Sequence, residues 1–331
     1  MLESKFKNLL AFLKNKNILI ITHEPADVDG LGSCFALKEF LEQYFQKKVR
    51  IYLSEMTRLA KSVLAKIKLK FPDNDFYLEE DVKLSLIDVI LILDTNNLDL
   101  LNCVGVDTVP HVFIDHHLWA NEEDGKNLDS LNIIMENYTS TAEVIFEIYQ
   151  NTQVSIPDHV KWLVLSSILT DSGFFKYANN NTLTRFTSIL GDTIDIQEIY
   201  SFLKIEEEFS EKMARIKGLQ RLEIIRENQI LIGLSKVSNY ESNVANSLIN
   251  IGFDISMVLS NRKKDLRITM RAKKEITASF GLNLGKILKD VANNFDGSAG
   301  GHEGAASISN FEDIEIIKEE VLKKIRQIIN D

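Results

Sequence analysis

Apolar runs of strand length alternate with helix-like segments through the first half of the chain. The predicted strands are residues 17–22, 49–53, 86–93, 109–114 and 132–135, and the predicted helices are residues 32–45, 139–150 and 157–171. The run at 86–93 is continuously apolar, which is typical of a parallel strand covered on both faces. This alternation predicts an α/β fold with a mainly parallel sheet covered by helices on both faces.

The pattern changes after Leu190. A charged, amphipathic segment at 194–219 predicts a connecting helix. Further strands are predicted at 230–234, 255–260 and 266–270, and further helices at 281–293 and 314–329. We therefore expect a first domain at residues 1–190, a linker at 191–218 and a smaller α/β domain at 219–331, with a cleft between the two domains.

Composition favours a folded, cytoplasmic protein. Of the 331 residues, 45% are hydrophobic and 26% are charged, which is ordinary for a globular chain. The two cysteines, Cys34 and Cys103, are too few for a disulfide framework and fit a reducing compartment. Residues 1–16 lack the features of a signal peptide, and no apolar run is long enough to span a bilayer, so we expect no membrane partner.

The formal net charge of −10 conceals one basic segment. Seven lysines and arginines lie between Arg262 and Lys274, against the single carboxylate of Asp265. A net-acidic protein with one basic stripe suits a small anionic ligand better than long duplex DNA, whose binding depends on extended phosphate contacts. The alternative for about half of these side chains is a solvated β-hairpin.

Four groups of carboxylate and imidazole side chains are spread along the first domain, and three of them follow directly on aliphatic runs. The groups are His23, Asp27 and Asp29; Asp94; Asp115, His116 and His117; and Asp171. In a parallel sheet, residues just past the carboxyl ends of the strands line the ligand crevice. Carboxylate and imidazole are the ligands used for manganese, magnesium, iron or zinc in hydrolysis. The sequence therefore predicts a two-metal phosphoesterase.

The first group crosses a predicted strand-to-helix turn. Such a turn can direct His23 and Asp27 at one cation and Asp29 at a neighbouring one. Ser33, a few residues further on, caps the following helix or contacts a phosphate. Asp94 would be costly to bury without a partner, so we expect it to bridge the two cations.

The run Asp115-His116-His117 is the most specific local signal. Adjacent strand residues point to opposite faces, so at most two of the three side chains face the cations. We assign His116 as a ligand, Asp115 as the carboxylate that fixes an imidazole tautomer, and His117 as the residue facing the scissile phosphate. The alternative for any one of these histidines is a core residue with satisfied hydrogen bonds.

Charge supports the presence of cations. The carboxylates of Asp27, Asp29, Asp94 and Asp171 carry four negative charges, which two divalent cations would cancel. Without them, a pair of carboxylates about 4 Å apart repels by about 4 kcal/mol at an effective dielectric near 20. No lysine or arginine lies near these residues in the sequence to offset that repulsion.

The second domain contains residues suited to phosphate. A turn at Gly300, Gly301 and His302 would expose backbone N–H groups and an imidazole to an anion, and Arg271 offers a bidentate fork. The alternative for the two glycines is a plain turn.

In order and spacing, the four ligand groups resemble the motifs of the DHH phosphoesterase superfamily, and the segment 139–143 is similar to a further shared motif. Met270-Arg271 and the segment 300–306 resemble the DHH-associated domain of the oligoribonuclease-like branch. The resemblance implies a bilobed, manganese-dependent phosphodiesterase. Its expected substrates are nanoRNA, linear or cyclic dinucleotides such as pApA and cyclic di-AMP, or 3′-phosphoadenosine 5′-phosphate, with release of 5′-mononucleotides.

The same resemblance implies roles for the site residues. His23, Asp27 and Asp94 would hold one Mn2+, and Asp29, Asp94, His116 and Asp171 would hold a second, with Mg2+ or another divalent cation also suitable. Arg271 and His302, with Gly300 and Gly301, would grip the end of a short RNA or dinucleotide. A homodimer is left open.

Two departures from the family pattern stand out. Pro25-Ala26-Asp27 replaces Pro-Asp before the second ligand, and Ala299 replaces the first glycine of the run before His302. A methyl at Ala299 matters only if that residue needs positive φ or its backbone touches the substrate.

Two alternative functions remain. One is a manganese inorganic pyrophosphatase, whose basic signature is similar to residues 260–264, although the Gly-Gly-His segment argues against it. The other is a non-catalytic nucleotide-binding protein with a degenerate site, against which the complete set of expected ligands argues.

Overall fold

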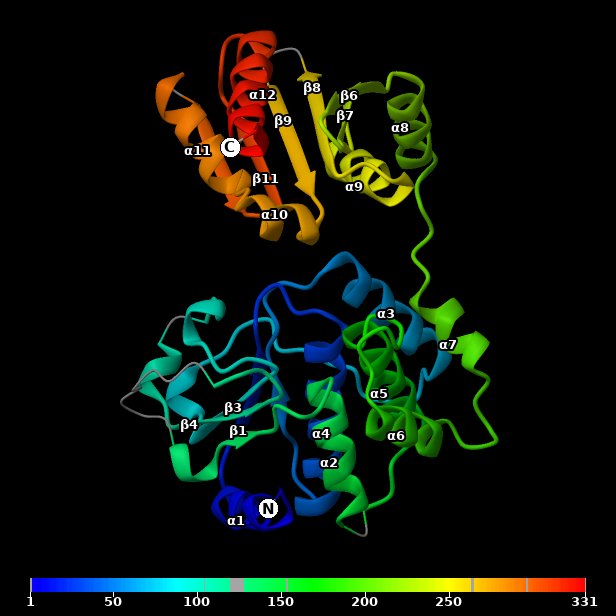
Figure 1. Ribbon diagram of the computed structural model, residues 1–331. Coiled ribbons are helices and arrows are strands. Elements are labelled where there is room, and N and C mark those ends of the chain that lie inside the picture. The colour runs from blue at the N-terminus through cyan, green and yellow to red at the C-terminus, as the bar shows by residue number, and fades with distance from the viewer. Residues whose placement is uncertain are drawn as a thin grey trace. The chain divides into compact units, whose positions relative to one another are not determined.

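The computed structural model describes residues 2–103, 105–119, 128–152, 154–262, 265–295 and 297–330. The chain divides into two compact units, residues 1–205 and 206–331. Each unit contains its own sheet (Figure 1). Each also has its own hydrophobic core. No helix in the described part of the chain is both long and apolar enough to cross a membrane.

The first unit is built on a five-stranded, wholly parallel sheet, which confirms the predicted α/β class. The strand order is β2 (Arg50–Ile51), β1 (Ile18–Thr22), β3 (Val89–Leu93), β4 (His111–Asp115) and β5 (Ile133–Ile134). Every residue of β1, β3 and β4 is buried, as their continuous apolar sequences predict.

The two faces of this sheet are covered differently. On one face, Ile20, Leu91 and Ile114 share a core with the α-helices. These are α1 (Leu2–Leu13), α2 (Val28–Phe45), α3 (Arg58–Lys70), α4 (Thr141–Gln150), α5 (Asp158–Asp171), α6 (Asn180–Leu190) and α7 (Ile196–Leu203). The opposite face, with Ile21 and Ile92, packs against segments that contain the short 3-10 helices η1 (Leu84–Leu86), η2 (Leu98–Leu100) and η3 (Val106–Thr108).

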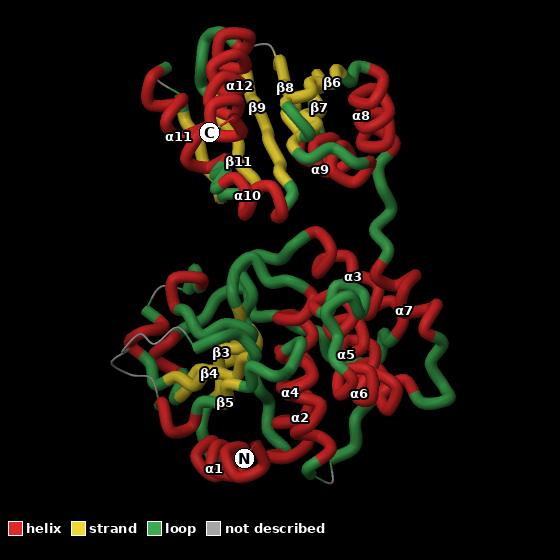
Figure 2. The backbone as a smooth tube through the Cα atoms, in the orientation of Figure 1, coloured by secondary structure: helices red, strands yellow, loops and turns green. Residues whose placement is uncertain are grey.

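The prediction of one connecting helix at 194–219 is wrong. Two helices, α7 and α8 (Phe209–Gln220), are separated by the non-helical residues 204–208, where the boundary between the units falls (Figure 2). Lys66 of α3 explains the early end of α7. Its Nζ donates hydrogen bonds of 2.7 Å to the carbonyl oxygens of Phe202 and Lys204, which satisfies groups that the last turn of a helix leaves free.

The second unit is a six-stranded mixed sheet. Its strand order is β10 (Ser298–His302), β11 (Ala305–Ser309), β9 (Asp265–Ala272), β8 (Ile255–Arg262), β7 (Ile230–Val237) and β6 (Glu223–Glu227). Helices α11 (Leu284–Asn294) and α12 (Ile314–Asn330) cover one face, and α9 (Glu241–Ile251) packs on the other face over β8 (Figure 1). The predicted helix at 281–293 starts later, because α10 (Lys274–Phe280) ends at Gly281 in a left-handed cap.

The predicted glycine-rich turn is instead a strand. Gly301 pairs with Ala306 and His302 pairs with Ala305, so the hairpin turn lies at residues 303–304. Gly301 has φ +137°, and a Cβ atom there would overlap the carbonyl oxygen of Ala305. Glycine is therefore required at this position for close strand pairing. Ala299 pairs with Ile308 and packs against the core, so its methyl group is accommodated.

Candidate functional site

The first ligand group surrounds the start of α2. This helix begins at Val28, earlier than predicted, because Asp27 caps it by accepting a 3.0 Å hydrogen bond from the backbone N–H of Gly30. Asp29 consequently lies in the first turn of the helix and not in a loop. Gly30 packs against Thr22 at the end of β1 so tightly that a Cβ atom would overlap its side chain. Close packing of the helix on the strand therefore fixes the direction of both aspartates.

The role predicted for Ser33 is wrong. Ser33 is fully buried one turn along α2, and its hydroxyl donates a 3.3 Å hydrogen bond to Oδ1 of Asp29. It neither caps the helix nor reaches the surface where a phosphate would bind. Asp29 also accepts backbone hydrogen bonds from Thr141 (2.6 Å) and Ala142 (3.0 Å) at the start of α4. Its carboxylate is thus held at a helix N-terminus, whose partial positive charge favours an anion.

Asp94 lies at the centre of the cluster. It follows β3 with a left-handed φ of +59° and is only 3% exposed. Nε2 of His23 lies 3.4 Å from its Oδ2 atom, whereas Nε2 of His116 lies 3.5 Å from its Oδ1 atom. The two oxygens of one carboxylate therefore face two different imidazoles, which is the geometry expected of a bridging ligand.

Asp115 ends β4 and organises the two histidines that follow it. Its Oδ1 atom lies 2.8 Å from Nδ1 of His117 and accepts a 2.7 Å hydrogen bond from the backbone N–H of His116. Asn96 donates a 2.7 Å hydrogen bond to its Oδ2 atom. The side chain of His117 is 56% exposed, so Asp115 holds one ring nitrogen of an imidazole that otherwise faces solvent.

A hollow of about 410 Å³ opens over this cluster. Its lining includes His23, Asp27, Asp94, Asp115, His117 and Asp171. The hollow is therefore bounded by side chains from the ends of β1, β3, β4 and α5, as expected for ligands at the carboxyl edge of a parallel sheet.

The described residues include two ligand sets that share Asp94. One set is His23, Asp27 and Asp94, and the other is Asp29, Asp94, His116 and Asp171; within each set the ligand atoms lie within 4.8 Å of one another. These are the two sets that the family resemblance implies. Asp115 and His117 form a third overlapping group with Asp94 and His116.

The surroundings of His116 show whether a metal ion fits this cluster. Its Nε2 atom is buried 3.0 Å from Oδ2 of Asp171, yet it has no hydrogen-bond partner among the described residues. Its other nitrogen, Nδ1, lies 3.3 Å from the carbonyl oxygen of Tyr138, which fixes the ring. A buried nitrogen aimed at carboxylates, on a ring held through its second nitrogen, is the arrangement typical of a metal ligand. The donor set therefore fits a divalent cation.

The ionisation of the cluster reflects crowding of like charges. Burial and the neighbouring carboxylates of Asp94 and Asp171 raise the pKa of Asp29 well above its usual range. Hydrogen bonding to Asp27 and Asp94 raises the pKa of His23 to about 10. Burial lowers the pKa of His116, but Asp171 and Asp94 outweigh it and raise the value to about 11. Protons thus occupy the lone pairs of imidazole nitrogens and carboxylate oxygens to which a metal cation would bind, so the two compete.

In the second unit, Arg271 and His302 lie in one row of the sheet. Ala305 of β11 pairs with Arg271 on one side and with His302 on the other, so the two side chains project from the same face. Arg271 is anchored by hydrogen bonds to the carbonyl of Met270 (2.9 Å) and the side chain of Asn246 (3.2 Å). Burial lowers its pKa, but an arginine remains charged.

The glycine strand borders a separate hollow of about 650 Å³. Its lining includes Gly300, Gly301 and His302 together with Lys286 and Lys289 of α11, but not Arg271. Of the basic stripe predicted around residues 262–274, Lys263 and Lys264 lie outside the described residues. Lys273 forms a 3.0 Å ion pair with Asp254, so its role is at least partly structural.

Comparison with known proteins identifies the family. The sequence model of the DHH family, N-terminal domain, matches residues 17–168. An uncharacterized protein of Methanocaldococcus jannaschii is 30% identical over 323 residues, which cover 96% of this chain and 94% of that protein. The chain belongs to the DHH family.

Two further similarities place this DHH protein among its relatives. The crystal structure of an exopolyphosphatase-related protein from Bacteroides fragilis is similar over 100% of this chain and 98% of its own, with a TM-score of 0.69 and 18% identity, which concerns the fold alone. A probable manganese-dependent inorganic pyrophosphatase of Staphylococcus epidermidis is 26% identical over 158 residues, 47% of this chain and 48% of that protein.

Sequence reasoning missed one residue of the DHH site. The sequence predicts a helix over residues 139–150, which includes Thr141, but assigns this residue no role in the site. In the structure Ser140 caps α4 by accepting a hydrogen bond from the backbone N–H of Glu143. Thr141 also donates its backbone N–H to Asp29 and its hydroxyl to Asp94. The signal available in the sequence was a polar residue directly after a cap, in a segment similar to a family motif.

Proposed function

We propose that this DHH protein is a two-metal phosphodiesterase that hydrolyses short oligoribonucleotides or dinucleotides to 5′-mononucleotides, with Mn2+ as its cofactor. Linear pApA, cyclic di-AMP and nanoRNA are the proposed substrates, and 3′-phosphoadenosine 5′-phosphate is a further one. The observation that carries the proposal is the pair of ligand sets joined at Asp94. Two cations held by such sets would polarise the phosphoryl oxygens and supply an activated water.

The protein's own side chains have three tasks in this reaction. Asp115 orients His117 through the 2.8 Å contact with Nδ1, and this hydrogen bond raises the pKa of His117. In its protonated form the ring can donate a hydrogen bond from Nε2 to a phosphoryl oxygen. Thr141 and Ser33 hold the carboxylates of Asp94 and Asp29 in place. Arg271 and His302, on one face of the second sheet, bind the nucleotide end that does not react.

A manganese-dependent inorganic pyrophosphatase is the second candidate, supported by the relative that aligns with about half of this chain. Full-length similarity is instead found with a protein of uncharacterized activity. The row formed by Arg271 and His302 favours a substrate with an organic end, because pyrophosphate has no such end to bind.

A substrate panel with added Mn2+ tests the proposal. The panel compares pApA, a five-nucleotide RNA, cyclic di-AMP, 3′-phosphoadenosine 5′-phosphate and pyrophosphate, with Asp171→Ala as the inactive control. We expect the fastest turnover on a nucleotide diester. Orthophosphate release from pyrophosphate at a higher rate would select the second candidate, and tight nucleotide binding without turnover of any compound would select a non-catalytic binding protein.

A further inference from the structure

Another hollow lies at the other edge of the first sheet, away from the metal ligands. It has a volume of about 550 Å³ and is formed by α1, the last turn of α2 and the loop that leads into β2. Its lining includes Ile18, the first residue of β1, whereas His23 follows the last residue of that strand. Four steps along a strand separate the two edges by roughly 13 Å. The hollow is therefore distinct from the proposed metal centre.

Five lysines surround this hollow, which we call the lysine groove. They are Lys7, Lys14, Lys16, Lys47 and Lys48, and the described lining contains no carboxylate. Lys7, Leu10 and Ala11 follow helical i, i+3, i+4 spacing and so share one face of α1, and Lys14 lies directly after the end of that helix. In a protein with a net charge of −10, this concentration of positive charge would attract a small polyanion.

Part of this charge is already used within the protein. Lys7 forms an ion pair with Glu3, and Nζ of Lys47 donates a 2.9 Å hydrogen bond to the carbonyl oxygen of Lys16. Lys14 and Lys48, in contrast, are exposed, although Lys48 also interacts electrostatically with the carboxylate of Asp75. Lysines after a helix also complement the negative end of its dipole, which is the competing explanation for the cluster.

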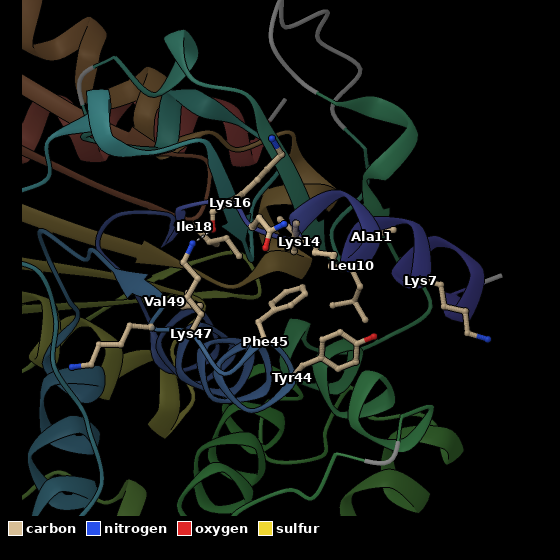
Figure 3. A pocket seen from close by; sticks show the side chains of 13 residues that line it. Lys7, Leu10, Ala11, Lys14, Lys16, Ile18, Tyr44, Phe45, Lys47 and Val49 are labelled. Atoms are coloured by element: carbon tan, nitrogen blue, oxygen red, sulfur yellow. Dashed lines mark hydrogen bonds between the residues drawn. The ribbon is translucent and has the colours of Figure 1, made fainter.

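The floor of the lysine groove is aromatic and apolar. Figure 3 shows the rings of Tyr44 and Phe45 beside Leu10, while Lys7 and Lys16 extend outward. Tyr44 is 49% exposed, although its ring is held by stacking 5.8 Å from Phe40 and by an edge contact 5.1 Å from Phe45. Interaction with the helix dipole would explain the presence of the lysines. It would not explain why an exposed aromatic ring is held in a fixed orientation in an open hollow.

We propose that the lysine groove binds a nucleoside polyphosphate, with the base on Tyr44 and the phosphates on the lysines. The volume lies within the range of about 300–1,000 Å³ typical of small-molecule sites. A flat heterocycle matches the half-exposed ring, and a chain of phosphates matches several lysines better than a single phosphate would. This site is additional to the proposed hydrolytic centre and does not depend on it.

Calorimetric titration with ATP, inorganic triphosphate and adenosine, in a chelator and without divalent ions, tests the proposal on the full-length protein. We expect ATP to bind about tenfold or more tightly than either fragment, since stacking and charge each contribute. The double variant Lys14→Glu/Lys48→Glu should weaken ATP binding by more than about tenfold. The matched control Lys61→Glu/Lys68→Glu, on two exposed lysines of α3, should leave ATP binding unchanged.

The aromatic contact has its own control pair. Tyr44→Ala should weaken ATP binding by about tenfold but leave triphosphate binding unchanged, whereas Tyr77→Ala, on a ring that is 59% exposed elsewhere, should alter neither. Equal affinity for triphosphate and ATP would overturn the proposal in favour of a general polyanion patch. ATP binding that survives Lys14→Glu/Lys48→Glu would overturn it too. If ATP fails to bind and that variant only lowers the melting temperature, the lysines serve the helix ends; binding to phosphatidylglycerol vesicles without ATP binding would indicate a membrane surface.

Discussion

The hydroxyl of Thr141 donates a 3.0 Å hydrogen bond to Oδ1 of Asp94, on the oxygen that also faces His116. Because its backbone N–H binds Asp29, this one residue connects α4 to two of the proposed ligands. Partners of this kind fix the direction of a metal-binding carboxylate.

Thr141→Val should therefore reduce Mn2+ affinity or turnover by about 10–100-fold, because the β-branched shape is kept and only the hydroxyl is lost. Thr141→Ser should restore most of the activity. The measurement is turnover of pApA as a function of Mn2+ concentration. Thr184→Val, on an exposed threonine of α6, is the control, and an equal loss in both variants would mean that Thr141 acts only through folding.

Metal binding should be visible in stability. Mn2+ is expected to raise the melting temperature and a chelator to lower it, since a ligand that binds only the native state stabilises it. At a Mn2+ concentration 100 times its Kd, the stabilisation is about 2.7 kcal/mol. Asp94→Ala should remove most of this shift and all activity, whereas Asp99→Ala, on the exposed turn after β3, should leave both intact. Identical melting curves with and without chelator would contradict the two-metal site.

The raised histidine pKa values predict a pH dependence for the protein in chelator. The pKa of His23 is about 10 and that of His116 about 11 when folded, against about 6.5 when unfolded. Their contribution to the free energy of unfolding is complete below pH 6.5 and is lost as the pH rises to about 10–11. Thermal melts across this range should show the decline, and His116→Gln should flatten it. Added Mn2+ should oppose the decline, because cation binding strengthens as protons leave.

The second unit should act on substrate selection alone. Arg271→Ala or His302→Ala is expected to lower cleavage of dinucleotides and short RNA by about 100-fold or more, while barely changing hydrolysis of bis-p-nitrophenyl phosphate, which has no nucleotide end. Asp171→Ala should abolish both activities. Arg226→Ala, on an exposed arginine of β6, is the control. Equal losses on the two substrates for Arg271→Ala would exclude a division of labour between the units.

Gly300 and Gly301 form a matched pair for testing backbone constraint. A Cβ atom at Gly301 would overlap β11, and its φ of +137° is strained for any other residue, whereas a Cβ atom at Gly300 meets nothing within 4 Å. Gly301→Ala should destabilise the protein by about 1–3 kcal/mol or more, and Gly300→Ala by a few tenths at most. Denaturant unfolding measures both, and similar values would contradict the strand pairing.

The parallel sheet of the first unit was predictable because its strands are buried on both faces and read as unbroken apolar runs, as in Val89–Leu93. That the ligand residues come together was predictable for a related reason: the carboxyl ends of the parallel strands β1, β3 and β4 lie at one edge of the sheet. Their division into two sets followed from the family resemblance. Strand β10 was not predictable, because Ser298–His302 contains too little apolar surface to mark a strand. It pairs with the adjacent strand β11, which in turn pairs with β9, a strand further away in the sequence.

The buried position of Ser33 also could not be predicted from the sequence. Where α2 begins depends on which residue caps it, and Asp27 and Ser33 are both good caps by type. In the structure Asp27 is the cap, because its carboxylate accepts the N–H of Gly30. The choice follows from packing of Gly30 against Thr22, a contact that only the folded chain contains. Thr141 was missed for the same reason, since its two partners lie 47 and 112 residues away in sequence.

The carboxylate that both ligand sets share has a consequence for how they fill. Oδ1 and Oδ2 of Asp94 face different histidines. A cation bound at one of these oxygens would therefore withdraw electron density from the other. Cation binding to the two sets should then be thermodynamically linked, and occupancy should depart from a simple hyperbola as the cation is titrated. An isotopic label on the carboxyl carbon of Asp94 would sense cation binding to both ligand sets. Its signal would therefore show the order in which the two sets bind their cations.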